Sequence, residues 1–155
     1  MSKRFKRFLA VAAILFFTEG ICFARAVVTM PILNATNSTS IAVNGTATVY
    51  TQEFPIESAQ YFEASYLANS TNGSVNVTIQ LEQGSVVPAT EGAANGNFTV
   101  PVNQPDIVTG LTTEDTWYHA AFSPVPLTYG RFKITGLGSN NADTILKIKV
   151  NEQVD

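Results

Sequence analysis

Apolar and polar residues alternate along short segments of this chain, and the pattern is clearest at residues 74–83. The apolar positions of that segment are Val75, Val77, Ile79 and Leu81. In a β-strand, a period of two places each set on one face. We therefore predict a half-buried antiparallel strand with these four side chains in the core.

Segments of the same kind recur through the rest of the chain and are rich in the residue types that strands favour. They lie at residues 39–43, 46–52, 59–68, 98–102, 116–122, 130–135 and 144–151. No helical periodicity of useful length follows the first 26 residues. About eight strands with regular turn signals predict an all-β fold, an antiparallel two-sheet β-sandwich or jelly roll.

Three Gly- and Asn-rich turns predict hairpins between neighbouring strands. Asn44-Gly45 is the strongest short hairpin signal, and residues 69–73 and 136–142 provide the other two turns. Residues 84–97 are predicted to form a surface loop. The strand at 98–102 contains a proline and is therefore predicted to lie at a sheet edge.

The first 26 residues have the layout of a secretory signal peptide. Basic residues precede an apolar run from Phe8 to Phe17, and Ala24-Arg25-Ala26 supplies the small residues that signal peptidase reads. The run is shorter than the roughly 20 residues that span a bilayer, so membrane contact is expected only through this leader. We expect a helical signal peptide at 1–26 and one β-sandwich domain at 27–155. Cleavage after Ala24 is the alternative.

Removal of the leader would change the composition of the chain. The one cysteine, Cys22, lies within it, so the exported part would have no disulfide. Five of the nine basic residues lie there but only one of the twelve acids, which leaves four basic against eleven acidic side chains and a net charge of −7 in place of −3. Such an acidic surface argues against nucleic-acid binding, which requires many phosphate contacts.

The four remaining basic residues predict an interaction surface. They alternate with apolar residues in the last two expected strands, so a C-terminal hairpin would place all four on one outward face. They are Arg131, Lys133, Lys147 and Lys149. Because like charges repel across strands, we expect this basic stripe to be neutralised by Glu63 and Glu82, or to meet an acidic surface on another copy or an anionic envelope polymer.

Few residues here are suited to catalysis. His119 is the only histidine, which excludes multi-His metal sites and, with no cysteine in the exported part, Cys–His nucleophiles. No Gly-x-Ser-x-Gly motif accompanies it. We expect His119 to be a half-buried structural residue, with Trp117 and Ala121 on the inward face. The prediction is that the protein is not an enzyme and needs no cofactor.

A calcium site is the one metal site that the turns suggest. Asn140, Asn141 and Asp143 would supply carboxylate and carbonyl oxygens, and Glu114 and Asp115 form a second candidate pair. Seven Asn-x-Ser/Thr sequons also occur, and we interpret them as a result of composition in a chain rich in these residues. The sequence leaves open whether they carry glycans.

Aromatic side chains form a second candidate surface. Sugar rings pack against aromatic faces, and the candidates for such stacking are Trp117, Tyr118, Tyr61, Tyr66 and Tyr129. The alternative is that most of them fill the core of the sandwich.

Export, a β-rich pattern and the charge asymmetry together predict a non-enzymatic structural or assembly protein, such as a subunit of a surface layer, fibre, appendage or coat. The alternative is a secreted carbohydrate-binding or adhesion module. We expect it to be secreted to the cell surface or beyond, or to the periplasm, with another copy, an anionic polymer or a glycan as partner. Residues 27–40 are either an arm that pairs with a neighbour or the first strand of their own sheet.

Overall fold

The computed structural model describes residues 26–56, 61–85, 97–102, 104, 106–122, 129–138 and 143–154. These residues form β-strands and no helix, which confirms the all-β prediction. The strands are β1 (Ala26–Ile32), β2 (Ile41–Asn44), β3 (Thr48–Tyr50), β4 (Phe54–Pro55), β5 (Tyr61–Asn72), β6 (Val77–Gly84), β7 (Phe98–Thr99), β8 (Val108–Leu111), β9 (Tyr118–Phe122), β10 (Tyr129–Gly136) and β11 (Asp143–Val154).

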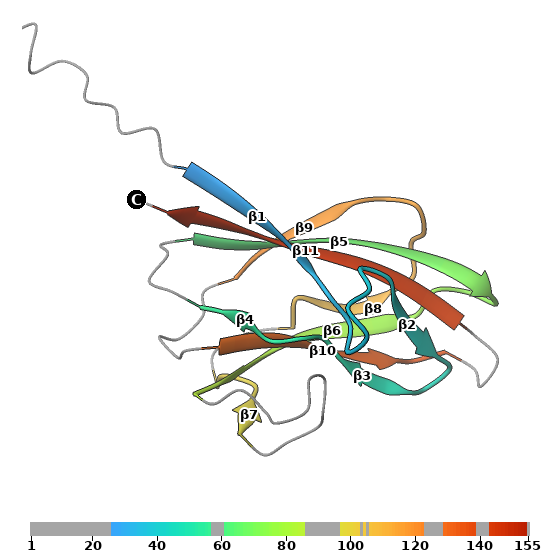
Figure 1. Ribbon diagram of the computed structural model, residues 1–155. Helices are drawn as coiled ribbons and strands as arrows, with labels where there is room; N and C mark the ends of the chain where they lie inside the picture. Colours follow the sequence, from blue (N-terminus) through green and yellow to red (C-terminus); the bar gives the residue numbers. More distant parts are fainter. Residues whose placement is uncertain are drawn as a thin grey trace, which may run out of the picture.

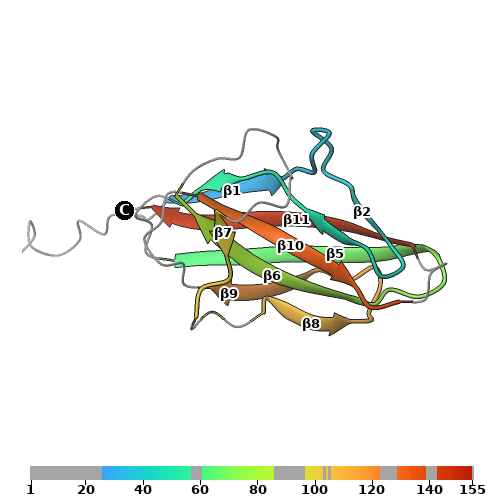
Figure 2. The same cartoon turned by 90° about the horizontal axis from the view of Figure 1, so that it is seen from below.

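The strands form two antiparallel sheets in a β-sandwich-like arrangement, seen as separate layers in Figure 1. The first sheet has the order β1-β11-β5-β9, with β2 also paired to β11. The second sheet has the order β3-β10-β6-β7, with β4 paired to β10 and β8 to β6. Figure 2 shows β10 and β6 running obliquely across β11 and β5.

The core lies between the sheets and contains the apolar positions that alternation predicts. Val75, Val77, Ile79 and Leu81 are fully buried, as are Phe132 and Ile134 on the neighbouring β10. On the first sheet, Leu146, Ile148 and Val150 of β11 point inward. Phe122 meets Phe132 edge-on across the core, with 6.2 Å between ring centroids. The alternation of residues 74–83 is therefore confirmed as a core pattern.

The predicted hairpin at Asn44-Gly45 is wrong, although the tight turn is present. Ala47 N–H donates to the Asn44 carbonyl at 2.9 Å, and Gly45 adopts a left-handed φ of 56°. However, β2 pairs with β11 of the first sheet, and β3 pairs with β10 of the second. The turn therefore joins two sheets as an arch.

The other two predicted hairpins are wrong for the same reason. Strand β5 pairs with β11 and β9, whereas β6 pairs with β10, β7 and β8. Likewise β10 lies in the second sheet and β11 in the first. In each case the consecutive strands turn their apolar faces toward each other across the core. A hairpin would set them side by side with their apolar faces in the same direction.

Residues 26–32 form a strand of their own sheet. β1 pairs with β11 from Ala26 opposite Val154 to Ile32 opposite Ile148. This confirms the own-strand interpretation of the segment over a detached arm. β2 pairs with the same side of β11 and begins with Ile41 opposite Leu146. Lys147 therefore lies between the part of β11 that pairs with β1 and the part that pairs with β2.

The remaining expectations have mixed outcomes. Among the described residues β7 lies at the end of the second sheet's order, as predicted, but it covers only Phe98–Thr99 of the predicted 98–102 and does not include Pro101. Residues 1–25 of the expected signal peptide at 1–26 and most of the expected loop at 84–97 lie outside the described residues, as do Asn140 and Asn141.

Candidate functional site

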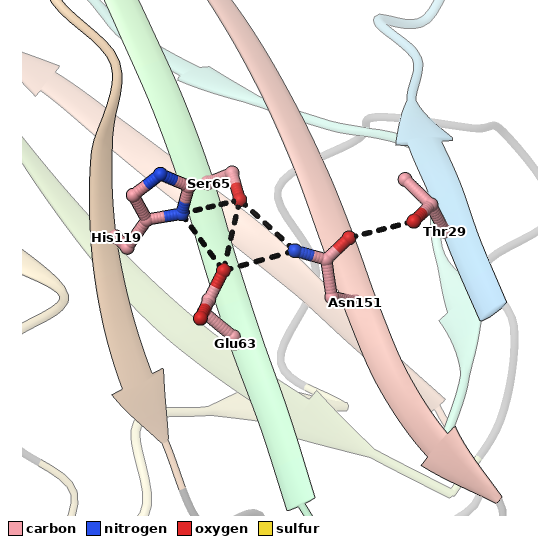
Figure 3. Close-up of polar contacts among 5 residues, drawn as sticks. All are labelled: Thr29, Glu63, Ser65, His119 and Asn151. Atoms are coloured by element: carbon pink, nitrogen blue, oxygen red, sulfur yellow. Dashed lines mark hydrogen bonds and ion pairs between the residues drawn. The ribbon is translucent and has the colours of Figure 1, made fainter. Parts of the chain in front are cut away.

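A row of hydrogen-bonded polar side chains crosses the outer face of the first sheet (Figure 3). Thr29 lies on β1, Asn151 on β11, Glu63 and Ser65 on β5, and His119 on β9. The strand register brings them together, because Thr29 is opposite Asn151, Asn151 is opposite Glu63, and Ser65 is opposite His119. Alternation places all five on the face opposite to the core.

One carboxylate oxygen is the centre of this row. Glu63 Oε1 lies 2.8 Å from His119 Nδ1 and accepts hydrogen bonds from Asn151 Nδ2 at 2.9 Å and Ser65 Oγ at 3.1 Å. Asn151 Oδ1 in turn accepts from Thr29 Oγ1 at 2.8 Å. The network therefore connects β1, β11, β5 and β9, which are four neighbouring strands of the first sheet.

Hydrogen bonding keeps Glu63 ionised. The hydrogen bond to His119 lowers the pKa of the Glu63 carboxyl below its ordinary value, and the bonds from Asn151 and Ser65 act in the same direction. Partial burial raises the pKa but is outweighed. A carboxylate that accepts several hydrogen bonds is stabilised in its charged form.

The serine, histidine and glutamate are not arranged as a catalytic triad. In a triad the serine contacts one ring nitrogen and the acid the other. Here Ser65 Oγ and Glu63 Oε1 both contact His119 Nδ1, at 2.9 and 2.8 Å. This geometry fixes the orientation of the imidazole ring and leaves the serine away from Nε2.

The prediction that His119 is half-buried is wrong. Its side chain is 58% exposed, and the inward set of β9 is Tyr118, Ala120 and Phe122 instead of Trp117 and Ala121. Tyr118 and Phe122 lie on the same face of β9, and burial of these two aromatic rings turns that face toward the core. Phe122 packs on Phe62 with 5.4 Å between ring centroids, and Tyr118 stacks on Tyr66 at 5.8 Å.

The five candidate stacking aromatics do not form one platform. Tyr66 is buried, which raises the pKa of its hydroxyl, and Tyr118 is half-buried against it. Tyr129 is half-buried on the second sheet, and the side chain of Tyr61 lies outside the described residues. Trp117, just before β9, is exposed.

The predicted basic stripe is also wrong in its geometry, because β10 and β11 belong to different sheets. Arg131 is only 1% exposed. Its Nε and Nη2 donate to Glu82 Oε2 at 3.0 and 2.7 Å, and its Nη1 lies 3.9 Å from Glu53 Oε1. The expected neutralisation by Glu82 is therefore present, as a buried pair.

Aromatic rings complete this buried cluster. The guanidinium carbon of Arg131 lies 4.3 Å from the ring centre of Tyr50 on β3 and 4.4 Å from that of Phe98 on β7. Stacking of this kind suits the flat guanidinium group. Lys133 lies half-buried on β10, and only Lys147 and Lys149, on β11, share an exposed face.

Alternation did not predict either cluster as a unit. Thr29, Glu63, Ser65 and Asn151 each occupy a polar position of a strand, but their contacts depend on the order of the strands in the sheet. The same holds for Glu53 and Phe98 around Arg131. The detectable signal was the presence of polar residues at outward positions of several strands.

Acidic side chains outside the polar row, among them the candidate Glu114, have structural contacts. Asp106 accepts from Gln80 at 2.7 Å and Thr109 at 3.0 Å, and Glu114 accepts from the Val75 backbone at 3.4 Å. Among the described residues no group of three His, Cys, Asp or Glu side chains gathers at a metal-binding distance. Asp143 is the one residue of the predicted calcium site that the structure describes.

The described part of the chain contains no helix long and apolar enough to cross a membrane. Comparison with protein-family models finds no family that matches the chain, and a search of curated proteins finds no relative.

Proposed function

We propose that the protein is an exported, non-enzymatic β-sandwich subunit that assembles with further copies of itself through the β1 edge of the first sheet. Within the described part of the chain, β1 pairs on one side only, with β11. A strand at a sheet edge presents backbone N–H and C=O groups to which a strand from another chain can pair.

The exposed apolar character of β1 carries this proposal. Val27 and Val28 are 65% and 44% exposed. They are neighbours and so point to opposite faces, which makes the edge apolar on both sides. Edge strands of monomeric proteins are commonly protected by charged side chains or proline; residues 26–32 contain no charged residue, and their one proline, Pro31, lies three residues beyond Val28.

The charge distribution restricts where a second copy can bind. With a net charge of −7 on the exported part, two copies repel each other over most of their surface. The uncharged β1 edge is a place where two copies meet without opposing like charges. Antiparallel pairing of β1 with its counterpart would continue the first sheet across a two-fold axis.

The polar row on the first sheet supports a structural role. Glu63, Ser65 and Asn151 connect β1 and β9 through β5 and β11, so a load on the β1 edge would be shared by the whole sheet. Ser65 and Glu63 both contact Nδ1 of His119, which favours a structural use of that histidine.

The test is sedimentation velocity of the purified protein over a range of concentrations, with electron microscopy of the same samples. We expect dimers or polymers, and the double variant Val27→Lys/Val28→Lys should weaken association by at least ~10-fold because lysines protect edges. Val102→Lys is the matched control, since Val102 is 99% exposed and lies outside the first sheet. A monomer at every concentration, or equal association by both variants, would contradict the proposal.

A further inference from the structure

A hollow of about 280 Å³ lies on the first sheet where β1 ends and β2 begins along β11. Its lining residues are Pro31, Thr39, Trp117, Lys147, Ile148 and Lys149. Pro31 lies opposite Lys149 in the β1–β11 register, and Trp117 approaches from the β9 side. The hollow therefore combines side chains from both flanks of β11.

An exposed aromatic ring and an ammonium group meet in this hollow. Trp117 is 39% exposed, and Lys149 Nζ lies 4.8 Å from the centre of its ring. The attraction between a cation and the electron-rich face of an indole holds the lysine beside the ring. A ligand lying against the ring therefore meets a positive charge.

A second lysine extends the positive charge. Lys147 is two residues before Lys149 on the same strand, so the two side chains leave the same face about 7 Å apart. Both are exposed. Neither has an ion-pair partner among the residues that the structure describes. Arg131, in contrast, is enclosed by Glu82 and Glu53.

We propose that this hollow binds an acidic polysaccharide, with a sugar ring against Trp117 and its carboxylate or sulfate groups on Lys147 and Lys149. The weakly positive C–H face of a sugar ring complements the negative face of an indole. Ammonium groups form charge-assisted hydrogen bonds with anionic oxygens. Thr39 adds a hydroxyl that donates to or accepts from a sugar hydroxyl.

The dimensions of the hollow favour a polysaccharide over other anionic partners. Pockets that enclose a small molecule usually measure about 300–1,000 Å³, and this hollow of about 280 Å³ is slightly smaller, as suits one unit of a chain lying across it. Anionic membranes are typically bound by clusters of about 4–8 basic residues, and this face has two lysines. The proposal can be tested separately from assembly, because Pro31 is the one lining residue that belongs to β1, and a monomer still presents the lysines and Trp117.

Trp117 is the only tryptophan of the chain, so its fluorescence reports directly on the hollow. The purified protein is titrated with oligogalacturonate, dextran sulfate and neutral dextran. We expect a saturable change in emission with one or both acidic polymers and none with neutral dextran. The preferred polymer identifies the anionic group as carboxylate or sulfate.

Charge variants test the assignment of the lysines. Lys147→Gln/Lys149→Gln should weaken binding by at least ~10-fold, whereas Lys133→Gln, which removes one charge from the second sheet, should change it by less than about twofold. Thermal unfolding followed by circular dichroism checks that both variants fold. Trp117→Leu, measured by calorimetry, should also weaken binding by at least ~10-fold.

Four outcomes would overturn the proposal. The first is no fluorescence change with either acidic polymer, and the second is an equal response to neutral dextran. The third is full binding by Lys147→Gln/Lys149→Gln. The fourth is equally tight binding of poly-glutamate, which would show that the hollow recognises anionic charge without recognising a sugar.

Discussion

Each sheet carries a cluster of charged side chains on its outer face, and the two clusters differ in their exposure. On the second sheet Arg131 is 1% exposed and lies directly opposite Glu82. On the first sheet the side chains of His119 and Glu63 are 58% and 41% exposed. Phe98 of the edge strand β7 and Tyr50 of β3 stack on Arg131, whereas no such cover lies on the Glu63 row among the described residues.

This difference shows that the surroundings of a charged pair set its energetic weight. Water can solvate the exposed pair when one partner is removed, so exposed pairs contribute only about 0–1 kcal/mol. A buried carboxylate that loses its cation has no such compensation. We therefore expect the Arg131 cluster to be essential to the fold and the Glu63 row to make only a small contribution to its stability.

The largest effect is expected from Arg131→Met. This substitution keeps an apolar stem but leaves Glu82 and Glu53 without their cation, so the free energy of unfolding should fall by about 3–5 kcal/mol. Urea unfolding measures it. The matched control is Lys133→Met on the same strand, which should change stability by about 0.5 kcal/mol or less.

A double variant sharpens this prediction. Arg131→Met/Glu82→Leu removes both members of the pair, and it should be less destabilising than the sum of the two single variants. A loss below about 1 kcal/mol in Arg131→Met would contradict the contrast between buried and exposed clusters.

A smaller, pH-dependent effect is expected from Glu63→Gln. The folded-state pKa of Glu63 is lowered from the ordinary value of 4.5, so its contribution to stability is fully present above that pH. It is lost as the pH falls through the lower folded-state pKa. The wild type should exceed the variant by less than about 1 kcal/mol at neutral pH because the site is exposed. Unfolding curves at neutral and acidic pH measure this difference in the free energy of unfolding. A difference that is larger at acidic than at neutral pH would contradict the lowered pKa of Glu63.

The smallest effect is expected from His119→Gln. The amide can still donate a hydrogen bond to Glu63, and the exposed ring buries little area, so stability should change by about 0.5 kcal/mol or less. Thermal unfolding of the two proteins is sufficient to measure this. A loss as large as that of Arg131→Met would remove the distinction between the clusters.

Alternation in the sequence predicted which faces of the strands are buried, but not which strands are neighbours. The faces of β6, β10 and β11 follow from their apolar positions, because burial of each side chain is a local property of its strand. Hairpins and arches use the same turn residues, and Asn44-Gly45 forms the tight turn in either case. The choice depends on pairings with strands distant in the sequence.

The errors at Arg131 and His119 have this same origin. Arg131 occupies an outward position, and its burial comes from Phe98 and Tyr50, whose proximity follows from strand order. The phase of β9 was misjudged because Trp117 and Phe122 are both large and apolar, and the contact of Phe122 with Phe62 decided between them. The exposure of Trp117 contradicts its expected inward position, and its contact with Lys149 depends on the order of the first sheet.

The central position of β11 has a consequence for how the chain folds. This twelve-residue strand is the last one that the structure describes, yet it pairs with β1, β2 and β5. The first sheet therefore cannot form until β11 has been synthesised, and its contacts join segments as far apart as Ala26 and Val154. Topologies dominated by such distant pairings fold slowly. Until β11 is available to pair with them, the apolar faces of β1 and β2 have no sheet of their own and stay exposed.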